Sequence, residues 1–319
     1  MSILGLTIDY GPFGFLDRYN PKFVPNTTDE QGRYRFEAQP SVCKWNLLKL
    51  AEALSIVVPM ASMREVIELH YDKEFQAHYV TKLRLKLGLL RKREPEDFGI
   101  VTSFFTALSK TNADFTNTFR CLSKLVPGTP TSTNELLAYL TSQSGTVQDA
   151  VRSINPSFSR AQVESLKILQ RESPQTFKML TGGQDGVIEK AEAALQAVET
   201  VKGMGAEQKT AFNEATWREW LVKYEARIGR ELEGLESAER ATALADRVRI
   251  MNGANPKYIL RNYLLQNAIK QAESGDYEGV HRLYRVMTDP FKEHEGNEDL
   301  GADGQIPEWA CNYVLSCSS

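Results

Sequence analysis

The stretch MSILGLTIDYGPFGFLD, residues 1–17, carries the most specific pattern in this 319-residue sequence. The residues before Asp9 are mostly apolar, the apolar run stops at Asp9, and Gly11 follows two positions later. A short apolar run that ends at a carboxylate predicts a buried β-strand with Asp9 at its exit. A strand at the very start of a chain is unusual, which suggests that sequence upstream of Met1 is missing.

The pair Asp9 and Gly11 has a chemical interpretation. Protein kinases place an Asp after a strand to bind Mg²⁺ against the phosphates of ATP, and a nearby glycine lets the backbone turn away. The metal then neutralises charge on the phosphate oxygens during transfer. Turns use Asp and Gly constantly, so a purely structural role for Asp9 is the alternative.

Most of the remaining sequence predicts helices. Residues 11–40 are rich in Gly, Pro and aromatic residues, which indicates a long ordered loop that packs against the protein. Apolar spacing of three to four residues predicts helices from Ser41 to Leu54 and over 62–91, where a brief alternation at 82–87 is compatible with a strand but has helical flanks. Further helices are expected over 96–109, 113–125, 132–142, 146–152, 159–171, 173–181, 212–229, 236–251, 257–269 and 277–287, and Gly182-Gly183 is a stop signal. Residues 185–209, with a break at Gly203 and Gly205, indicate an exposed, weakly packed helix or a family-variable insertion. The apolar stripe in 212–229, formed by Trp217, Trp220, Leu221 and Tyr224, is expected to pack in the core.

Composition excludes several functional classes. The formal net charge is -3, so no overall basic field predicts nucleic-acid binding. No apolar run approaches the roughly 20 residues that cross a membrane. The four histidines show no metal-ligand spacing, and four scattered cysteines argue against a disulfide framework or a zinc site: Cys43, Cys121, Cys311 and Cys317.

Several long blocks resemble the selenoprotein O family, also called the YdiU family. Besides residues 1–17, they are GRYRFEAQP at 32–40, CKWNLLKLAEAL at 43–54, ADFTNTFR at 113–120, NPKYILRNYLLQNAI at 255–269, and the ending PEWA…SCSS. The blocks extend from the first residue to the last, with looser similarity over 125–250. Blocks of this length and number make a chance match very improbable.

The resemblance implies a protein-kinase-like fold that binds ATP in an unusual orientation. Members of the family transfer AMP from ATP to Ser, Thr or Tyr hydroxyls of proteins, release pyrophosphate, and use Mg²⁺ (or Mn²⁺). Asp9 would then bind both the metal and ATP, and residues 10–40 would be the activation-loop equivalent. The protein partners would be the substrates.

The sequence departs from the family pattern in three ways. The family's Asp-Asn pair, which supplies the base and a second metal ligand, lies upstream of Met1, as do the Gly-rich loop and the nucleotide-binding Lys. No catalytic residue can therefore be assigned here, and this chain alone is expected to be inactive. Pro25 stands where many bacterial members have a loop cysteine. Val314 replaces the first Cys of the Cys-x-x-selenocysteine ending, and Cys317 stands at the selenocysteine position, which leaves Cys317 as a candidate redox residue.

The expected fold is mainly α, a helical C-lobe of a kinase-like fold with a helical C-terminal extension and a short N-terminal β-strand. Residues 1–180 would form the partial C-lobe, and residues 181–319 the family-specific region, with a flexible linker at 289–306 and a cysteine-containing tail that Trp309 docks. The alternatives to an adenylyltransferase are a non-catalytic interaction or regulatory fragment and a phosphate-transferring kinase fragment. By resemblance, localisation would be mitochondrial in a eukaryote and cytoplasmic in a bacterium.

Other polar residues have simpler expected roles. Tyr258, Arg261 and Asn262 are expected inside the C-terminal helices, and Asp17 and Asp29 are expected to structure the loop. A solvated face or a helix end is the expected place of a basic cluster formed by Lys82, Arg84, Lys86, Arg91, Lys92 and Arg93.

Overall fold

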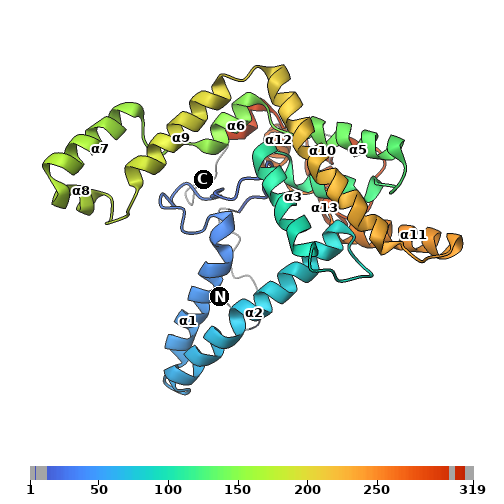
Figure 1. The fold of residues 1–319 in the computed structure, drawn as a ribbon, viewed down its shortest axis with the longest axis horizontal. Coiled ribbons are helices and arrows are strands. Elements are labelled where there is room, and N and C mark those ends of the chain that lie inside the picture. The colour runs from blue at the N-terminus through green and yellow to red at the C-terminus, as the bar shows by residue number, and fades with distance from the viewer. Residues whose placement is uncertain (1–3, 5–12, 302–305, 313–319) are drawn as a thin grey trace.

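A computed structural model of the chain describes residues 4, 13–301 and 306–312. In that part the secondary structure consists of thirteen α-helices and short 3₁₀ turns, with no strand (Figure 1). Arg18 and Asp114 form an isolated antiparallel bridge. The prediction of a mainly α chain is confirmed. The predicted strand that ends at Asp9 lies outside the described residues, and assignment to a kinase-like C-lobe stays a prediction.

The helices follow one another with short connections. The first seven are α1 (Gln39–Leu54), α2 (Met60–Leu87), α3 (Asp97–Thr111), α4 (Phe115–Cys121), α5 (Pro130–Ser142), α6 (Val147–Ile154) and α7 (Arg160–Glu172). The remaining six are α8 (Pro174–Leu180), α9 (Val187–Lys202), α10 (Ala206–Glu231), α11 (Ser237–Ala254), α12 (Asn262–Glu273) and α13 (Glu278–Met287). The 3₁₀ turns are η1 (Phe36–Ala38), η2 (Leu122–Lys124), η3 (Glu298–Leu300) and η4 (Glu308–Asn312).

Local sequence explains most helix ends. Ser159 caps α7 in a reciprocal capping box with Gln162. Helix α2 ends at Gly88, whose φ of 69° belongs to the left-handed region, and a Cβ there would lie 2.6 Å from Met251 Sδ. Helix α1 begins at Gln39, two residues before its predicted start at Ser41, and the Ser41 hydroxyl donates to Ala38 O.

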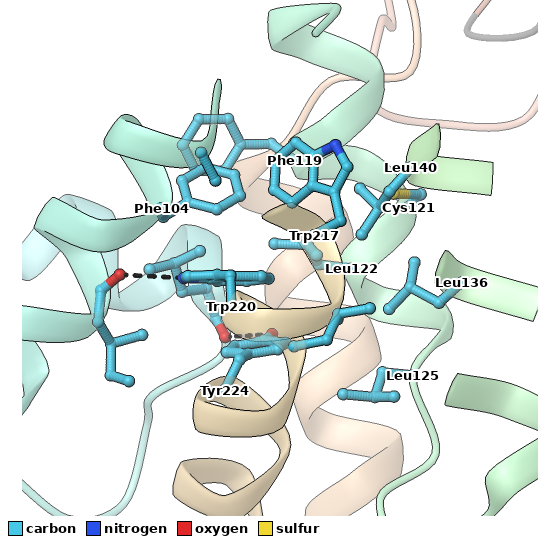
Figure 2. Packing of buried hydrophobic residues seen from close by; sticks show 14 of the residues in the cluster. Phe104, Phe119, Cys121, Leu122, Leu125, Leu136, Leu140, Trp217, Trp220 and Tyr224 are labelled. Carbon is cyan, nitrogen blue, oxygen red and sulfur yellow. Dashed lines mark hydrogen bonds between the residues drawn. The ribbon is translucent and has the colours of Figure 1, made fainter. Parts of the chain in front are cut away.

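The main hydrophobic core surrounds α10. Trp217, Trp220 and Tyr224 lie on one face of this helix and are almost fully buried. The Trp220 and Tyr224 rings stack at 4.6 Å, and Phe104 of α3 packs on Trp220 at 4.8 Å (Figure 2). Leucines of α2, α4, α5 and η2 complete the cluster. The predicted core role of this aromatic stripe is confirmed.

The packing does not follow the predicted boundary between residues 180 and 181. The main core joins α3 and α5, which precede that boundary, to α10 and α11, which follow it. A second cluster also crosses it, since Val163 and Phe177 pack with Ile188 and Ala191 of α9. Helix α9, expected to be weakly packed, buries these residues against α6, α7 and α8. The division into two regions therefore does not correspond to two separate cores.

Helices α1 and α2 form a hairpin that projects from this body (Figure 1). Lys44 of α1 joins the two helices through Glu68 at 2.7 Å and Asp72 at 2.8 Å. The connection at the tip is highly exposed, with Ile56 at 92%. Residues 82–87, in which basic and apolar side chains alternate, do not form a strand, because they continue α2.

The C-terminal segment differs from prediction in two places. Helix α12 begins at Asn262 instead of residue 257, because the N–H groups of Lys257 and Tyr258 bond to Pro290 O at 2.9 and 3.2 Å. Through Pro290, residues 289–301 contact the rest of the chain, although their composition predicts that they are part of a flexible linker. Tertiary contacts there include Arg282 with Asp299 at 2.7 Å, and Leu300 in a third apolar cluster with Tyr258.

Residues 306–312, the described part of the tail, contact the C-terminal helices. Ala310 is buried in that third cluster, and the Lys270 ammonium lies 5.4 Å from the Trp309 ring centre. A search of the described helices finds none with the length and apolar character that a membrane crossing requires.

We expect Trp217→Ala to lower the free energy of unfolding by about 3–5 kcal/mol, because it leaves a cavity in the fully buried core and removes the hydrogen bond from its indole N–H to Ser144 Oγ. Urea denaturation measures the change. The matched control is Val222→Ala on the exposed side of the same helix, expected to change stability by less than about 0.5 kcal/mol. Equal effects of the two substitutions would contradict this core assignment.

Candidate functional site

The two residues with a predicted chemical role, Asp9 and Cys317, lie outside the described residues. What the structure describes is the loop that follows Asp9, from Phe13 to the start of η1, and the surface that holds it. In the described part of the chain no three His, Cys, Asp or Glu side chains converge as metal ligands.

Arg261 anchors the loop through a buried ion cluster. Its guanidinium pairs with Asp17 of the loop at 2.7 Å and with Asp114, the N-cap of α4, at 2.8 Å. The Arg261 side chain is only 2% exposed, and it also donates to Asn117 Oδ1 at 3.2 Å. A planar guanidinium has donors enough for several acceptors at once, which suits it to a buried cluster. Burial of Arg261 is confirmed, while Asp17 does more than structure its own loop.

Backbone pairing strengthens the same junction. Phe115 N–H donates to Asp17 O at 3.0 Å, and Tyr19 N–H donates to Ala113 O at 2.9 Å. These bonds lie on either side of the bridge between Arg18 and Asp114. The loop thus runs antiparallel to the residues that begin α4, and both its main chain and its carboxylate are fixed there.

The buried carboxyl group of Asp114 needs its partners to stabilise its charged form. Burial raises the pKa of its carboxyl group, while Arg261 and the backbone N–H of Asn117 act in the opposite direction. Removal of Arg261 would leave this carboxylate buried without a cation. Such a loss is far more costly than the loss of a surface pair.

Arg18 provides a second anchor, on the side of α6. Its guanidinium lies 3.2 Å from Asp149 Oδ2 and donates to the carbonyl oxygens of Asn112 and Gln143 at 3.3 and 3.4 Å. Asp149 also closes the capping box of α6 with Thr146. The loop is therefore held to both α4 and α6.

Beside the loop lies an aromatic cavity of about 560 Å³. Phe13, Phe15 and Phe36 line it from the loop side, and Phe119 and Lys86 line the opposite wall. The Lys86 ammonium donates to Ala254 O at 3.1 Å and lies 4.7 Å from the Phe119 ring centre. Burial lowers the pKa of Lys86 to about 8.

Arg84 and Lys86 of the basic cluster lie in the last turn of α2, so the helix end is confirmed as their place, but neither side chain is on a solvated face. Lys86 faces the aromatic cavity, and Arg84 is 8% exposed and forms an ion pair with Asp97. Both point inward because α2 packs against α3 and α11 at its C-terminal end. The local sequence around a basic residue does not show whether its side of the helix faces solvent or a neighbouring helix.

The remaining expectations concern single residues. Asp29 does structure its loop, since its carboxylate accepts the N–H groups of Arg33 and Tyr34 at 2.9 and 2.8 Å. Cys43 and Cys121 are free thiols, and burial raises the pKa of Cys121, which makes it unreactive. Sequence analysis missed Arg18, Asp114 and Asp149. Asp114 does lie within a block that carries the resemblance.

Arg261→Met is expected to destabilise the chain by about 3–5 kcal/mol, because Asp114 stays buried without its cation. Cleavage of the loop between Arg18 and Arg35 by trypsin should accelerate as well. Urea denaturation and limited proteolysis measure the two effects. Arg249→Met, which removes an exposed pair with Asp246, is the control and should cost less than about 1 kcal/mol. An Arg261 variant as stable and as resistant as the wild type would refute the anchor.

Stability should depend on pH through Lys86. Its pKa is about 8 in the folded chain against 10.5 when exposed, so the unfolded chain binds more protons between these values. The free energy of unfolding of the wild type, relative to Lys86→Met, should therefore rise between about pH 8 and 9.5, at up to about 1.4 kcal/mol per pH unit. Urea titrations at each pH give the free energies of unfolding of the wild type and of Lys86→Met. The contribution of tyrosine ionisation is common to the two proteins and cancels in the difference. A difference that stays flat across this range would show that Lys86 is not buried.

Comparison with known proteins gives the family. Residues 1–288 match the family described as "Protein adenylyltransferase SelO". The chain is 38% identical over 334 residues to "Protein adenylyltransferase SelO, mitochondrial" of Homo sapiens, covering all of this chain and 49% of that protein. It is 37% identical over 330 residues to the Mus musculus protein of the same name, with the same coverage.

Bacterial proteins match as well. Identity to "Protein nucleotidyltransferase YdiU" of Myxococcus xanthus is 31% over 319 residues, covering all of this chain and 48% of the relative. The chain thus spans about half the length of the curated relatives it matches. The family match includes Asp9, the anchored loop and Arg261, and the resemblance seen in the sequence blocks is confirmed: this chain belongs to the SelO protein adenylyltransferase family.

Proposed function

We propose that this chain forms part of an enzyme that transfers AMP from ATP to hydroxyl groups of proteins. The observation that carries the proposal is the family match, which begins at residue 1 and so includes the segment around Asp9. Because the chain spans about half of its relatives, the activity is proposed for the protein as a whole. Asp9 is proposed to bind Mg²⁺ (or Mn²⁺) and ATP.

The anchored loop supports this role for Asp9. Transfer from ATP depends on positioning and on charge stabilisation, so a metal-binding carboxylate needs a firm backbone on its C-terminal side. Asp17 provides it, since Arg261 and the backbone of Phe115 fix this residue on α4 and α12. We propose that residues 10–40 act as the activation-loop equivalent and contact the protein substrate.

Localisation is proposed from the names of the relatives. The human and mouse relatives are named mitochondrial. By that similarity, the protein would be mitochondrial if its source is a eukaryote and cytoplasmic if it is a bacterium. A redox role for Cys317 is also proposed only by similarity.

The test of Asp9 uses this chain within its complete coding sequence. ATP labelled at the α-phosphate should transfer label to protein, whereas ATP labelled at the γ-phosphate should not. Asp9→Asn should lower transfer at least about 100-fold, because it removes the charge that binds the metal. Asp29→Asn is the control, a carboxylate of the same loop that binds only its own turn, and it should keep most of the activity.

Mass spectrometry of the modified protein separates the alternatives. An added AMP supports the proposal, and an added phosphate supports a protein kinase. Undiminished AMP transfer by Asp9→Asn would exclude Asp9 as a required ligand. A complete protein that modifies nothing would favour the non-catalytic alternative.

A further inference from the structure

A second cleft of about 940 Å³ lies away from the loop, between α5, the start of α6 and α10. The turn at residues 144–146 separates it from Arg18, and nothing in the proposed transfer reaction uses it. Leu137, Val147 and Met204 form an apolar part of its wall, and polar residues from α5, α6 and α10 line the rest.

Lys209 of α10 lines this cleft and is a buried cation without a counterion. Its residue is 4% exposed, and its ammonium donates to Lys110 O at 3.1 Å. Among the described residues no carboxylate lies within 4 Å of it. Asp149 acts on it only at longer range, because Arg18 and Arg152 hold the Asp149 oxygens at 3.2 and 3.6 Å. Burial accordingly lowers the pKa of Lys209.

Asn213, one turn further along the same face, is also incompletely paired. It is 3% exposed, its amide nitrogen donates to Gly145 O at 3.2 Å, and its Oδ1 has no hydrogen-bond partner. A buried acceptor left unpaired destabilises the fold, and a buried cation left unpaired destabilises it more. Two such groups on one helix face, beside an open cleft, indicate a site that a ligand completes.

Charge and shape define the ligand. Arg218 and Glu214 at the edge of the cleft pair with each other at 2.6 Å, so Lys209 leaves the lining with a net positive charge. An acid group would satisfy the free ammonium donors, and a neighbouring O–H or N–H would suit Asn213. The apolar wall suits a hydrocarbon body, as in most small-molecule sites.

We propose that this cleft binds a small organic acid, with its carboxylate or phosphate on Lys209 and its apolar body against Leu137, Val147 and Met204. The site is independent of the proposed AMP transfer. It is a binding site, and no chemical step is assigned to it.

Isothermal titration calorimetry on the full 319-residue chain at pH 7 tests the proposal. Three probes share a phenyl ring: mandelate, a carboxylate with an adjacent hydroxyl; phenyl phosphate; and mandelamide, the neutral counterpart of mandelate. Mandelate or phenyl phosphate should bind at least tenfold more tightly than mandelamide. Whichever acid binds better identifies the acid group that the site prefers.

Two variants localise the binding. Lys209→Met should weaken binding of the acid at least tenfold, whereas Lys202→Met, on the neighbouring α9, should leave it unchanged. Ala138→Trp fills the cleft from the exposed side of α5 while keeping Lys209, so it should abolish binding even if Lys209→Met fails to fold. Circular dichroism checks the fold of each variant. Failure of both acids to bind, equal binding of mandelamide, or undiminished binding by a folded Ala138→Trp would each overturn the proposal.

Discussion

One face of α10 holds the described part of the molecule together. Its aromatic residues form the centre of the main core, but the same face also carries polar atoms that reach the connections between other helices. Apolar burial alone would allow α3 and α5 to slide along α10, since it is not directional. Hydrogen bonds at regular intervals along the face fix their register. They run from Lys209 to Lys110 O, Asn213 to Gly145 O, Trp217 to Ser144 Oγ, Trp220 to Ile100 O, Tyr224 to Leu87 O, and Arg227 to Asp97.

The anchor of the loop is continuous with this face. The turn that α10 holds at Gly145 is also bonded to Thr111, and Asp114 N–H donates to Gln143 O just before that turn. Asp114 in turn holds Arg261, which holds Asp17. Gly145 is needed at this point, because a Cβ there would lie 2.8 Å from the Cβ of Asn112. The described part of the loop is therefore connected to the core at Asp17 by direct contacts instead of resting on the surface.

Sequence patterns predicted the helices well, because apolar spacing reports directly on the buried face of each one. The aromatic stripe of α10 and the stop at Gly182 and Gly183 are examples, the latter confirmed by positive φ values at both residues. The start of α12 could not be read in this way, because Pro290 supplies the acceptor that keeps Lys257 and Tyr258 out of the helix. The anchor was equally hidden. Arg261 joins carboxylates 244 and 147 positions away in the chain, at Asp17 and Asp114, and no local pattern marks such a pairing.

The buried cations separate into two kinds. Arg227 is surrounded by Glu94, Asp97 and Glu231, and Arg261 by two carboxylates, so these two buried guanidinium groups have their charge matched within the fold. Arg247, only 3% exposed, instead donates to neutral acceptors, the carbonyl oxygens of Leu122 and Leu125 and the hydroxyl of Tyr224. Lys86 and Lys209 have a single carbonyl bond each and lie beside clefts. Arginine cannot shed its proton in a protein, so a buried arginine needs partners in the fold itself. A lysine can become neutral when buried, and the fold tolerates it with fewer partners. Incomplete pairing at a lysine thus marks a place where the fold has left a charge unmatched, beside space that another molecule can enter.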